Sequence, residues 1–173
     1  MIDFGYGVQL VPISDQHLYW IFECRNNIKI REWCRQHTLL NELVHRGWYQ
    51  LQAQDPTMCM FVINNIDNKP VGVCGLTSID HRNSRAEFSC WIDPDEQQKG
   101  YCTNGLKTLF AHGFKDLNLN IIWGETFDGN PALRIFREKL GMKYEGARRQ
   151  FYFKGGKYID AHLISITKDE FMV

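Results

Sequence analysis

The sequence predicts a layered α/β (α+β) fold in which helices cover both faces of a mixed sheet. Three observations predict it: an early strand followed by two helices, three successive strands in the middle, and strand–helix alternation that ends in a hairpin. No repeat, low-complexity tract or linker interrupts the 173 residues. We therefore expect residues 1–173 to form a single domain.

The first half of the chain is predicted to hold a strand, two helices and three strands. Ser14 opens the first helix, and the second helix carries the apolar residues Leu43, Val44, Trp48 and Leu51. The polar turn at residues 65–70 joins the first two of the three strands. The expected bounds, in chain order, are residues 8–13, 14–27, 41–54, 58–64, 71–80 and 84–92.

A strand, a glycine turn and a helix follow one another between residues 84 and 117. The strand ends at Pro94, Gly100 forms the turn, and the helix places apolar residues at spacings of three and four, namely Leu106, Leu109, Phe110, Phe114 and Leu117. The first N–H groups of a helix lack partners and attract phosphates, and Lys99 adds a positive charge. The local chemistry suggests a pyrophosphate cradle, although most glycine turns before helices bind nothing.

A second strand–helix unit follows. Residues 120–127 are a mostly apolar strand that ends at the turn Asp128-Gly129. Asn130 is a favoured N-cap, Pro131 occupies the preferred first helical position, and Gly141 supplies a left-handed stop. This pattern predicts a helix of about ten residues. The chain then closes with a hairpin formed by residues 145–153 and 158–167.

The two units together resemble the signature motifs of the GNAT N-acetyltransferase superfamily. The resemblance rests on Gln97-x-x-Gly100-x-Cys102 and on Asn130 with the later run Glu138-Lys-Leu-Gly-Met142, and it extends from about residue 8 to the C-terminus. The ribosomal-protein-alanine and nucleotide-amino-sugar branches are the most similar. The resemblance implies a mostly antiparallel central sheet of about seven strands. Cys102 stands where Gly or Ala is usual, and Gly105, where Ala is common, weakens the helix by about 1 kcal/mol.

The resemblance also implies a reaction. Acetyl-CoA would donate an acetyl group to a primary amine by direct transfer in a ternary complex, with its thioester arm in a gap between strands 84–92 and 120–127. The residues that the resemblance assigns to the coenzyme are Cys90, Trp91, Ile92, Gln97, Gln98, Lys99, Gly100, Tyr101, Cys102, Thr103, Asn130 and Arg137.

Glu87 is the first candidate for the catalytic base. Strand alternation places Glu87, Ser89 and Trp91 on one face, opposite Phe88 and its even-numbered neighbours. A carboxylate inside an apolar strand is unfavourable unless it has a partner or a task. The alternative is a structural salt bridge to Arg85, Arg82 or a cross-strand cation.

A general acid is harder to find. Relatives often place Tyr seven residues after the motif asparagine, or Ser three residues after it, and this chain has Arg137 and Leu133 there. Arg137 cannot readily release a proton. Tyr152 or solvent could protonate the sulfur, and the sequence does not choose between them.

The acceptor side is expected to involve the early helices and the final hairpin. By resemblance to nucleotide-amino-sugar acetyltransferases, we expect Arg25, Arg31, Trp33 and Trp48 to bind the acceptor. With Arg148 and Arg149, the first two arginines could bind an acidic group such as a diphosphate. The alternative is that the tryptophans pack in the core and the arginines lie on the surface. The acceptor could be a small amine, an amino sugar or a protein N-terminus.

Composition bears on the remaining questions of partners, cell compartment and metal binding. Lys and Arg balance Asp and Glu at 20 each, which argues against nucleic acid or anionic membrane as a partner. The six scattered cysteines indicate reduced thiols in a cytoplasmic protein, and no histidine pair has metal-ligand spacing, so we expect no metal. Exposed strand edges in this fold could pair as a homodimer. A non-catalytic acyl-CoA sensor is the alternative function, which Leu133 and Arg137 favour.

Overall fold

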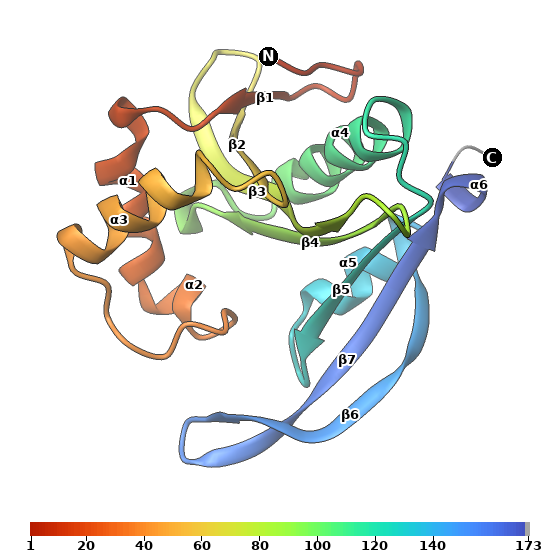
Figure 1. Cartoon of the computed structure of the whole chain (residues 1–173). Helices are drawn as coiled ribbons and strands as arrows, with labels where there is room; N and C mark the ends of the chain where they lie inside the picture. Colours follow the sequence, from red (N-terminus) through yellow and green to blue (C-terminus); the bar gives the residue numbers. More distant parts are fainter. Residues whose placement is uncertain (172–173) are drawn as a thin grey trace.

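The computed structural model describes residues 1–171 and contains one seven-stranded sheet. The strand order is β1-β2-β3-β4-β5-β7-β6, and all neighbours are antiparallel except β4 and β5, which run parallel (Figure 1). The mixed, mostly antiparallel sheet is therefore confirmed. The strands are β1 Gln9–Pro12, β2 Cys59–Asn64, β3 Pro70–Asp80, β4 Arg85–Ile92, β5 Ile121–Phe127, β6 Lys143–Lys154 and β7 Lys157–Thr167.

The helices agree with the predicted order, except that α2 and α6 were not predicted and α5 is shorter than expected. They are α1 Asp15–Asn26, α2 Ile28–Arg31, α3 Glu42–Gln52, α4 Tyr101–Lys115, α5 Ala132–Glu138 and α6 Lys168–Phe171. The four residues of α2 were not predicted, because one turn is too short to show a helical period. Helix α5 has seven residues rather than about ten, and its N-cap is Pro131 rather than the predicted Asn130. The Asn130 side chain nevertheless accepts a hydrogen bond from the Ala132 amide at 2.9 Å. Gly141 has the expected left-handed backbone, with φ 70°.

Two apolar clusters on opposite faces hold the helices against the sheet. The predicted face of α4 packs with β2 to β5, and its four central apolar residues are fully buried: Leu106, Leu109, Phe110 and Phe114. On the other face, Leu18 and Ile21 of α1 pack with Val62, Val73 and Trp91. Helices thus cover both faces, as predicted (Figure 1). Phe88 and Ile92 lie in the first cluster and Trp91 in the second, which confirms the strand alternation in β4.

Gly105 has a packing role that its helix propensity did not indicate. A Cβ at this position would lie 2.6 Å from Cδ1 of Ile63, a fully buried residue of β2. The missing side chain therefore lets α4 approach the sheet closely. The loss of helix propensity, about 1 kcal/mol, is offset by close packing of the helix that opens the predicted cradle.

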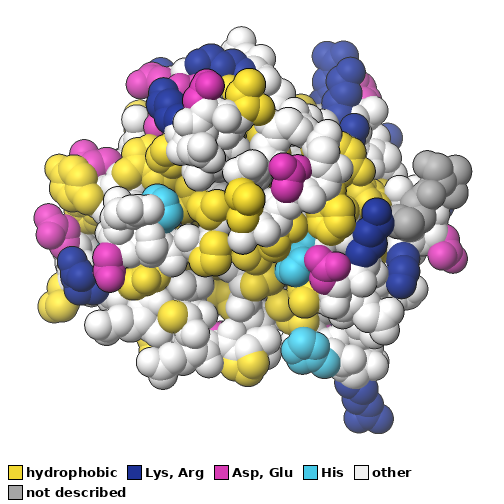
Figure 2. Space-filling model, turned by 90° about the horizontal axis from the view of Figure 1, so that it is seen from above, with side chains coloured by type: hydrophobic (Ala, Val, Ile, Leu, Met, Phe, Trp, Pro, Cys, Tyr) yellow, Lys and Arg dark blue, Asp and Glu magenta, His cyan; other side chains and the backbone are white. Residues whose placement is uncertain are grey.

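Hairpin β6–β7 extends beyond the other strands of the sheet (Figure 1), and Lys154 next to its turn donates to the carbonyls of Arg31 and Cys34. Strands β1 and β6 form the two edges of the sheet. Seen from above, hydrophobic side chains gather across the middle of the surface, and charged side chains lie mainly around its margin (Figure 2). A homodimer through such surfaces stays a prediction. Across residues 1–171, no helix is both long and apolar enough to cross a membrane.

Candidate active site

The turn before α4 has the conformation that an anion cradle requires. Gly100 is the N-cap of α4 in the left-handed region with φ 84°, and open space surrounds the position of its missing side chain. The first intrahelical bond comes from the Asn104 amide to the Gly100 carbonyl, at 3.1 Å. The amides of Tyr101, Cys102 and Thr103 precede it and have no acceptor within the helix. Such N–H groups at a helix start are available to an anion.

Side chains of the same segment hold the turn in place. Gln97 Nε2 donates to the Ile92 carbonyl at 3.2 Å, which closes the turn after β4. Lys99 and Lys69 both pair with Glu96, and their hydrogen bonds lower the pKa of that carboxyl. The predicted charge of Lys99 is therefore engaged by an acid. We conclude that an anion here would depend chiefly on main-chain amides.

The sheet parts beside this turn. Strands β4 and β5 pair only at Arg85↔Ile121, Ala86↔Ile122 and Glu87↔Trp123. Within the described part of the chain, residues 88–92 have no strand partner on the β5 side, whereas β5 continues to Phe127 along β7. The backbone edge at the predicted residues Cys90, Trp91 and Ile92 therefore faces a gap. The resemblance implied a gap at this place.

Two carboxylates meet on one face of the sheet at the start of the gap. Glu87 of β4 and Glu125 of β5 have side chains that are 11% and 5% exposed. Nη2 of Arg35, from the segment after α2, contacts Glu87 and lies 3.1 Å from Glu125 Oε1. Nη1 of Arg148 lies 3.0 Å from Glu125 Oε2. The cation paired with Glu87 is thus neither Arg85, which pairs with Asp80, nor a residue of the sheet.

Tyr152 of β6 completes this cluster. Its hydroxyl donates to Glu125, and its ring packs edge-on to Phe127 at 5.1 Å. Burial, followed by the hydrogen bond to Glu125, raises the pKa of Tyr152 to about 12. The phenol therefore keeps its proton at neutral pH. Its bond orients Glu125, so Tyr152 is better placed to position that carboxylate than to deliver a proton to sulfur.

Hydrogen bonds to the body fix the segment that carries Arg35. Arg25 binds the Gln36 carboxamide oxygen through Nε and Nη2, at 3.2 and 2.9 Å. The Asn26 side chain exchanges two hydrogen bonds with the Leu40 backbone. Lys154 of the hairpin donates to the carbonyls of Arg31 and Cys34. The Arg25-Asn26 pair thus supports the acceptor-side segment in this structure, and contact of Arg25 with an acceptor stays a prediction.

The two predicted tryptophans differ in their surroundings. Trp48 stacks on His45 at 5.5 Å and packs against the second apolar cluster. Nε2 of His45 donates to the Leu18 carbonyl at 3.1 Å, so this pair ties α3 to α1. Trp33 is half-exposed. Trp33 is therefore free to contact a ligand, whereas the ring of Trp48 is largely used in packing.

The start of α5 offers no acid. Asn130 accepts a hydrogen bond from the Ala132 amide, Leu133 packs against the first apolar cluster, and the guanidinium of Arg137 lies 5.8 Å from the ring centre of Tyr144. Contact of Arg137 with the coenzyme remains a prediction. The positions where relatives carry a Ser or Tyr thus have no proton-donating side chain in this protein.

Two thiols lie at the other face of the gap. Cys90 Sγ and Cys102 Sγ are 3.9 Å apart, and the hydrogen bond from Cys90 lowers the pKa of Cys102. Cys102 thus bridges the first turn of α4 to β4 with a small side chain, which agrees with its predicted role as a space-filling residue.

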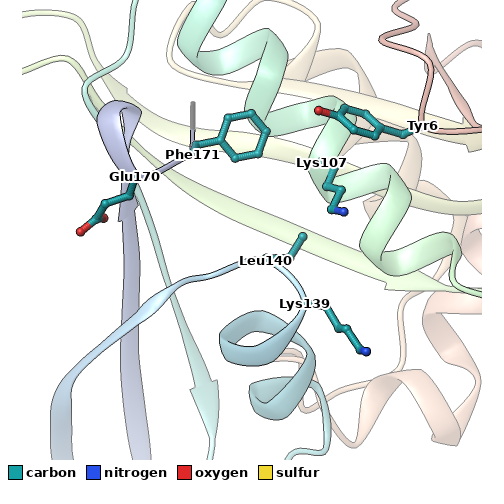
Figure 3. A pocket seen from close by; sticks show the side chains of 6 residues that line it. All are labelled: Tyr6, Lys107, Lys139, Leu140, Glu170 and Phe171. Atoms are coloured by element: carbon teal, nitrogen blue, oxygen red, sulfur yellow. The ribbon is translucent and has the colours of Figure 1, made fainter. Parts of the chain in front are cut away.

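A separate cavity of about 260 Å³ lies between α4, the end of α5 and α6 (Figure 3). Lys107 and Lys139 contribute amines, while the rings of Tyr6 and Phe171 form its apolar wall; Leu140 and Glu170 complete the lining. This cavity shares no residue with the carboxylate cluster. Among residues 1–171, no group of three or more His, Cys, Asp or Glu is arranged to hold a metal ion.

Sequence reasoning did not include Glu125 and Arg35. Glu125 gives the same signal as Glu87, a carboxylate inside an apolar strand, and could have been found by that argument. Arg35 lies in an irregular segment without periodicity, and only the fold brings it to Glu87, 52 residues away along the chain. No sequence signal marks it.

An open helix N-terminus, a parted parallel strand pair and adjacent buried carboxylates define an acyl-transferase type of site. The sequence profile of the Acetyltransferase (GNAT) domain matches residues 8–143, so the chain belongs to the GNAT acetyltransferase family. Family membership and the N-acetyltransferase class are thus confirmed, whereas the predicted branch is not settled.

Individual relatives agree with this assignment. The chain is 27% identical to the spermidine N(1)-acetyltransferase of Escherichia coli K12, over 97% of this chain and 90% of that protein. It is 26% identical to the N-acetyltransferase YoaA of Bacillus subtilis, over 92% of each chain. The crystal structure of the Vibrio cholerae spermidine N-acetyltransferase with CoA and spermine superposes with a TM-score of 0.91 at 22% identity, covering 96% of this chain and 99% of that one. This structural similarity shows that the two proteins share the same fold.

Proposed function

We propose that the protein transfers the acetyl group of acetyl-CoA directly to the primary amine of a small acceptor that also carries an anionic group. The observation that carries this proposal is the meeting of Glu87 and Glu125 at the start of the β4–β5 gap, in a chain that also has an open N-terminus at α4. The cradle suits a diphosphate, and the gap suits an extended thioester arm.

The carboxylates supply the proton acceptor. Glu87 or Glu125 takes a proton from the acceptor's ammonium group, directly or through water, and the free amine nitrogen then attacks the thioester carbonyl. The carbon–sulfur bond breaks as the amide forms, and CoA leaves as a thiolate that takes a proton from solvent. A backbone N–H of β4 that faces the gap would stabilise the oxyanion. Glu87 remains the first choice as base, because Glu125 is already bound by Arg148 and Tyr152.

Arg35 has a place in this scheme. Its guanidinium lies between the two carboxylates, where an acceptor's ammonium group would need to bind. The arginine side chain is half-exposed and can therefore move aside. We infer that the acceptor amine competes with Arg35 for Glu87 and Glu125.

Charge around the cluster favours an acceptor with an acidic group. The segment at residues 28–38 carries three basic residues against one acidic, and residues 143–162 carry five against two, in a chain that is neutral overall. Arg35 and Arg148 bring these two segments together at Glu125. Positive charge at the approach to a site raises the local concentration of anions and disfavours polycations. A polyamine acceptor is the second candidate, which similarity to the E. coli enzyme favours.

A thiol-release assay with purified protein distinguishes the anionic acceptor from the polyamine acceptor. Acetyl-CoA is offered with a nucleotide-linked amino sugar, a peptide N-terminus and spermidine. We expect the highest kcat/KM with the anionic amine, and a decrease with added salt. A preference for spermidine would contradict the anionic acceptor. Coenzyme binding without any acceptor-dependent thiol release would favour the sensor alternative.

Substitution of the carboxylates tests the base. Glu87→Gln should lower kcat while CoA still binds, and Glu125→Gln should lower it less if Glu125 only helps to bind the amine. General-base catalysis contributes about 10²–10⁴-fold, so a Glu87→Gln enzyme with normal turnover across the pH range would exclude Glu87 as the base.

A further inference from the structure

We propose that Trp123 binds the acceptor, with its indole ring against the carbon skeleton that carries the reacting amine, a role that rests on the proposed function. Trp123 lies on β5, and its backbone pairs with Glu87 of β4 on one side and with Ser165 of β7 on the other. The residue is only partly buried. Because its backbone is covered by a strand on each side, the surface that remains accessible belongs mainly to the indole.

Strand alternation turns this indole to the face of the sheet that carries the two carboxylates. Ile122 packs in the first apolar cluster, and a Cβ on Gly124 would meet the same cluster. Trp123 lies between them and therefore projects to the opposite face, as Glu125 does. Paired strands are about 5 Å apart and alternate residues of one strand about 7 Å apart, so the base of the Trp123 side chain lies within about 7 Å of those of Glu87 and Glu125. An ammonium group bound between these carboxylates is thus within reach of the ring.

Packing in the core does not account for the ring of Trp123. Among residues 1–171, Trp123 belongs to neither of the two apolar clusters. The residues that cross the sheet at its level are polar, with Thr77 and Glu87 on one side and Ser165 on the other. Three of the other tryptophans do support the core, since they lie in or against the second cluster: Trp20, Trp48 and Trp91.

The indole N–H of Trp123 is also available to a ligand. In the described part of the chain it donates to no protein atom, yet it is not one of the buried polar atoms without a partner, which are Gln9 Oε1, Asn64 Oδ1 and Thr126 Oγ1. The N–H is therefore accessible to solvent. An indole combines an apolar face that attracts cations with one donor at its edge. Such a ring suits an acceptor whose ammonium-bearing carbon skeleton lies close to a hydroxyl or an anionic oxygen.

Steady-state kinetics on Trp123→Leu test this inference with whichever of the three acceptors above gives the highest kcat/KM. Leucine keeps an apolar side chain and removes both the ring face and the N–H. We expect the KM for the acceptor to rise by about three- to thirtyfold with little change in kcat, while the Kd for CoA, measured by calorimetry, stays within about twofold. Trp123→Phe keeps a ring face and removes only the N–H, so it should raise the acceptor KM less.

Trp20→Leu is the matched control. Trp20 is also partly buried, but it packs against the second apolar cluster, and its Nε1 donates to Asp93 at 3.0 Å. This variant should melt at a lower temperature and keep the acceptor KM of the wild type. An unchanged acceptor KM in Trp123→Leu would overturn the inference, as would equal losses in kcat, CoA affinity and acceptor KM, which a purely structural role would produce. Wild-type protein that releases no thiol with any amine would instead refute the proposed function itself.

Discussion

Gly124→Ala is expected to destabilise the protein, although alanine is normally the better residue in a strand. Gly124 lies on β5 directly before Glu125, beside the point where β4 and β5 part. A Cβ there would lie 2.4, 2.8 and 3.0 Å from three atoms of the Phe88 ring. Phe110 and Phe136 hold this ring edge-on at 5.5 and 5.1 Å. The ring therefore cannot turn away freely.

Two opposing effects set the magnitude. Overpacking a tight core costs about 1–3 kcal/mol, and glycine within a strand is itself about 0.5–1 kcal/mol worse than alanine. We expect a net loss of about 1–2 kcal/mol in the free energy of unfolding, which is a fall in Tm of several degrees for a chain of this size.

Denaturant titration with a matched control measures this effect. Gly47 lies within α3, and an added Cβ there would meet no atom within 4 Å. Gly47→Ala should therefore stabilise the protein by about 1 kcal/mol. The two variants carry the same chemical change, and only the packing around them differs.

A double-mutant cycle with Phe88→Leu isolates the clash. In that background the ring atoms Cε1 and Cζ, which would lie 2.4 and 3.0 Å from the added Cβ, are gone, so Gly124→Ala should cost at least about 0.5 kcal/mol less. Gly124→Ala that stabilises the wild-type protein, or that shows no coupling to Phe88→Leu, would refute the close approach of β5 to this ring.

Two further predictions concern charge. Arg35→Gln should lower the KM for the acceptor by about two- to fivefold with little change in kcat, because the amine no longer competes with a half-exposed guanidinium. Arg134→Gln, which removes an exposed ion pair with Glu138, is the control. A higher KM for Arg35→Gln would mean that Arg35 binds the acceptor. Hydrogen bonds from Lys143 and Thr167 lower the pKa of Glu170 from 4.5 to about 2, so its contribution to stability is complete above about pH 4.5 and disappears as the pH falls through about 2. The difference in Tm between wild type and Glu170→Gln should shrink over that range in thermal melts, and a difference independent of pH would contradict this assignment.

Local signals accounted for most of the fold. The apolar face of α4, the left-handed Gly100 and Gly141, and the alternation of Phe88 and Trp91 all follow from short-range sterics and periodicity. Such features depend on residues within one or two turns of each other. The single turns of α2 and α6 and the exact length of α5 were missed, because a helix of four residues, or a change of a few residues at a helix end, gives no clear periodicity in the sequence.

The site was only partly predictable for a related reason. Glu87 was found because a carboxylate in an apolar strand is unfavourable without a partner, and Glu125 gives the same signal. The residues that pair with these two carboxylates could not be predicted in this way. Arg35, Arg148 and Tyr152 come from three separate segments, and their distances to the carboxylates depend on how those segments pack.

By itself, the sequence determined the order of the strands and the main helices, the glycine turn at the start of α4 and the family, because these features depend on residues that are adjacent along the chain. Tertiary structure alone decided which cation lies between Glu87 and Glu125, why Gly105 and Gly124 lack side chains, and that the Thr126 hydroxyl is buried without a partner. Each of these depends on atoms that are distant along the chain and close in space. Their energies arise only when the sheet has formed and the helices have packed on it.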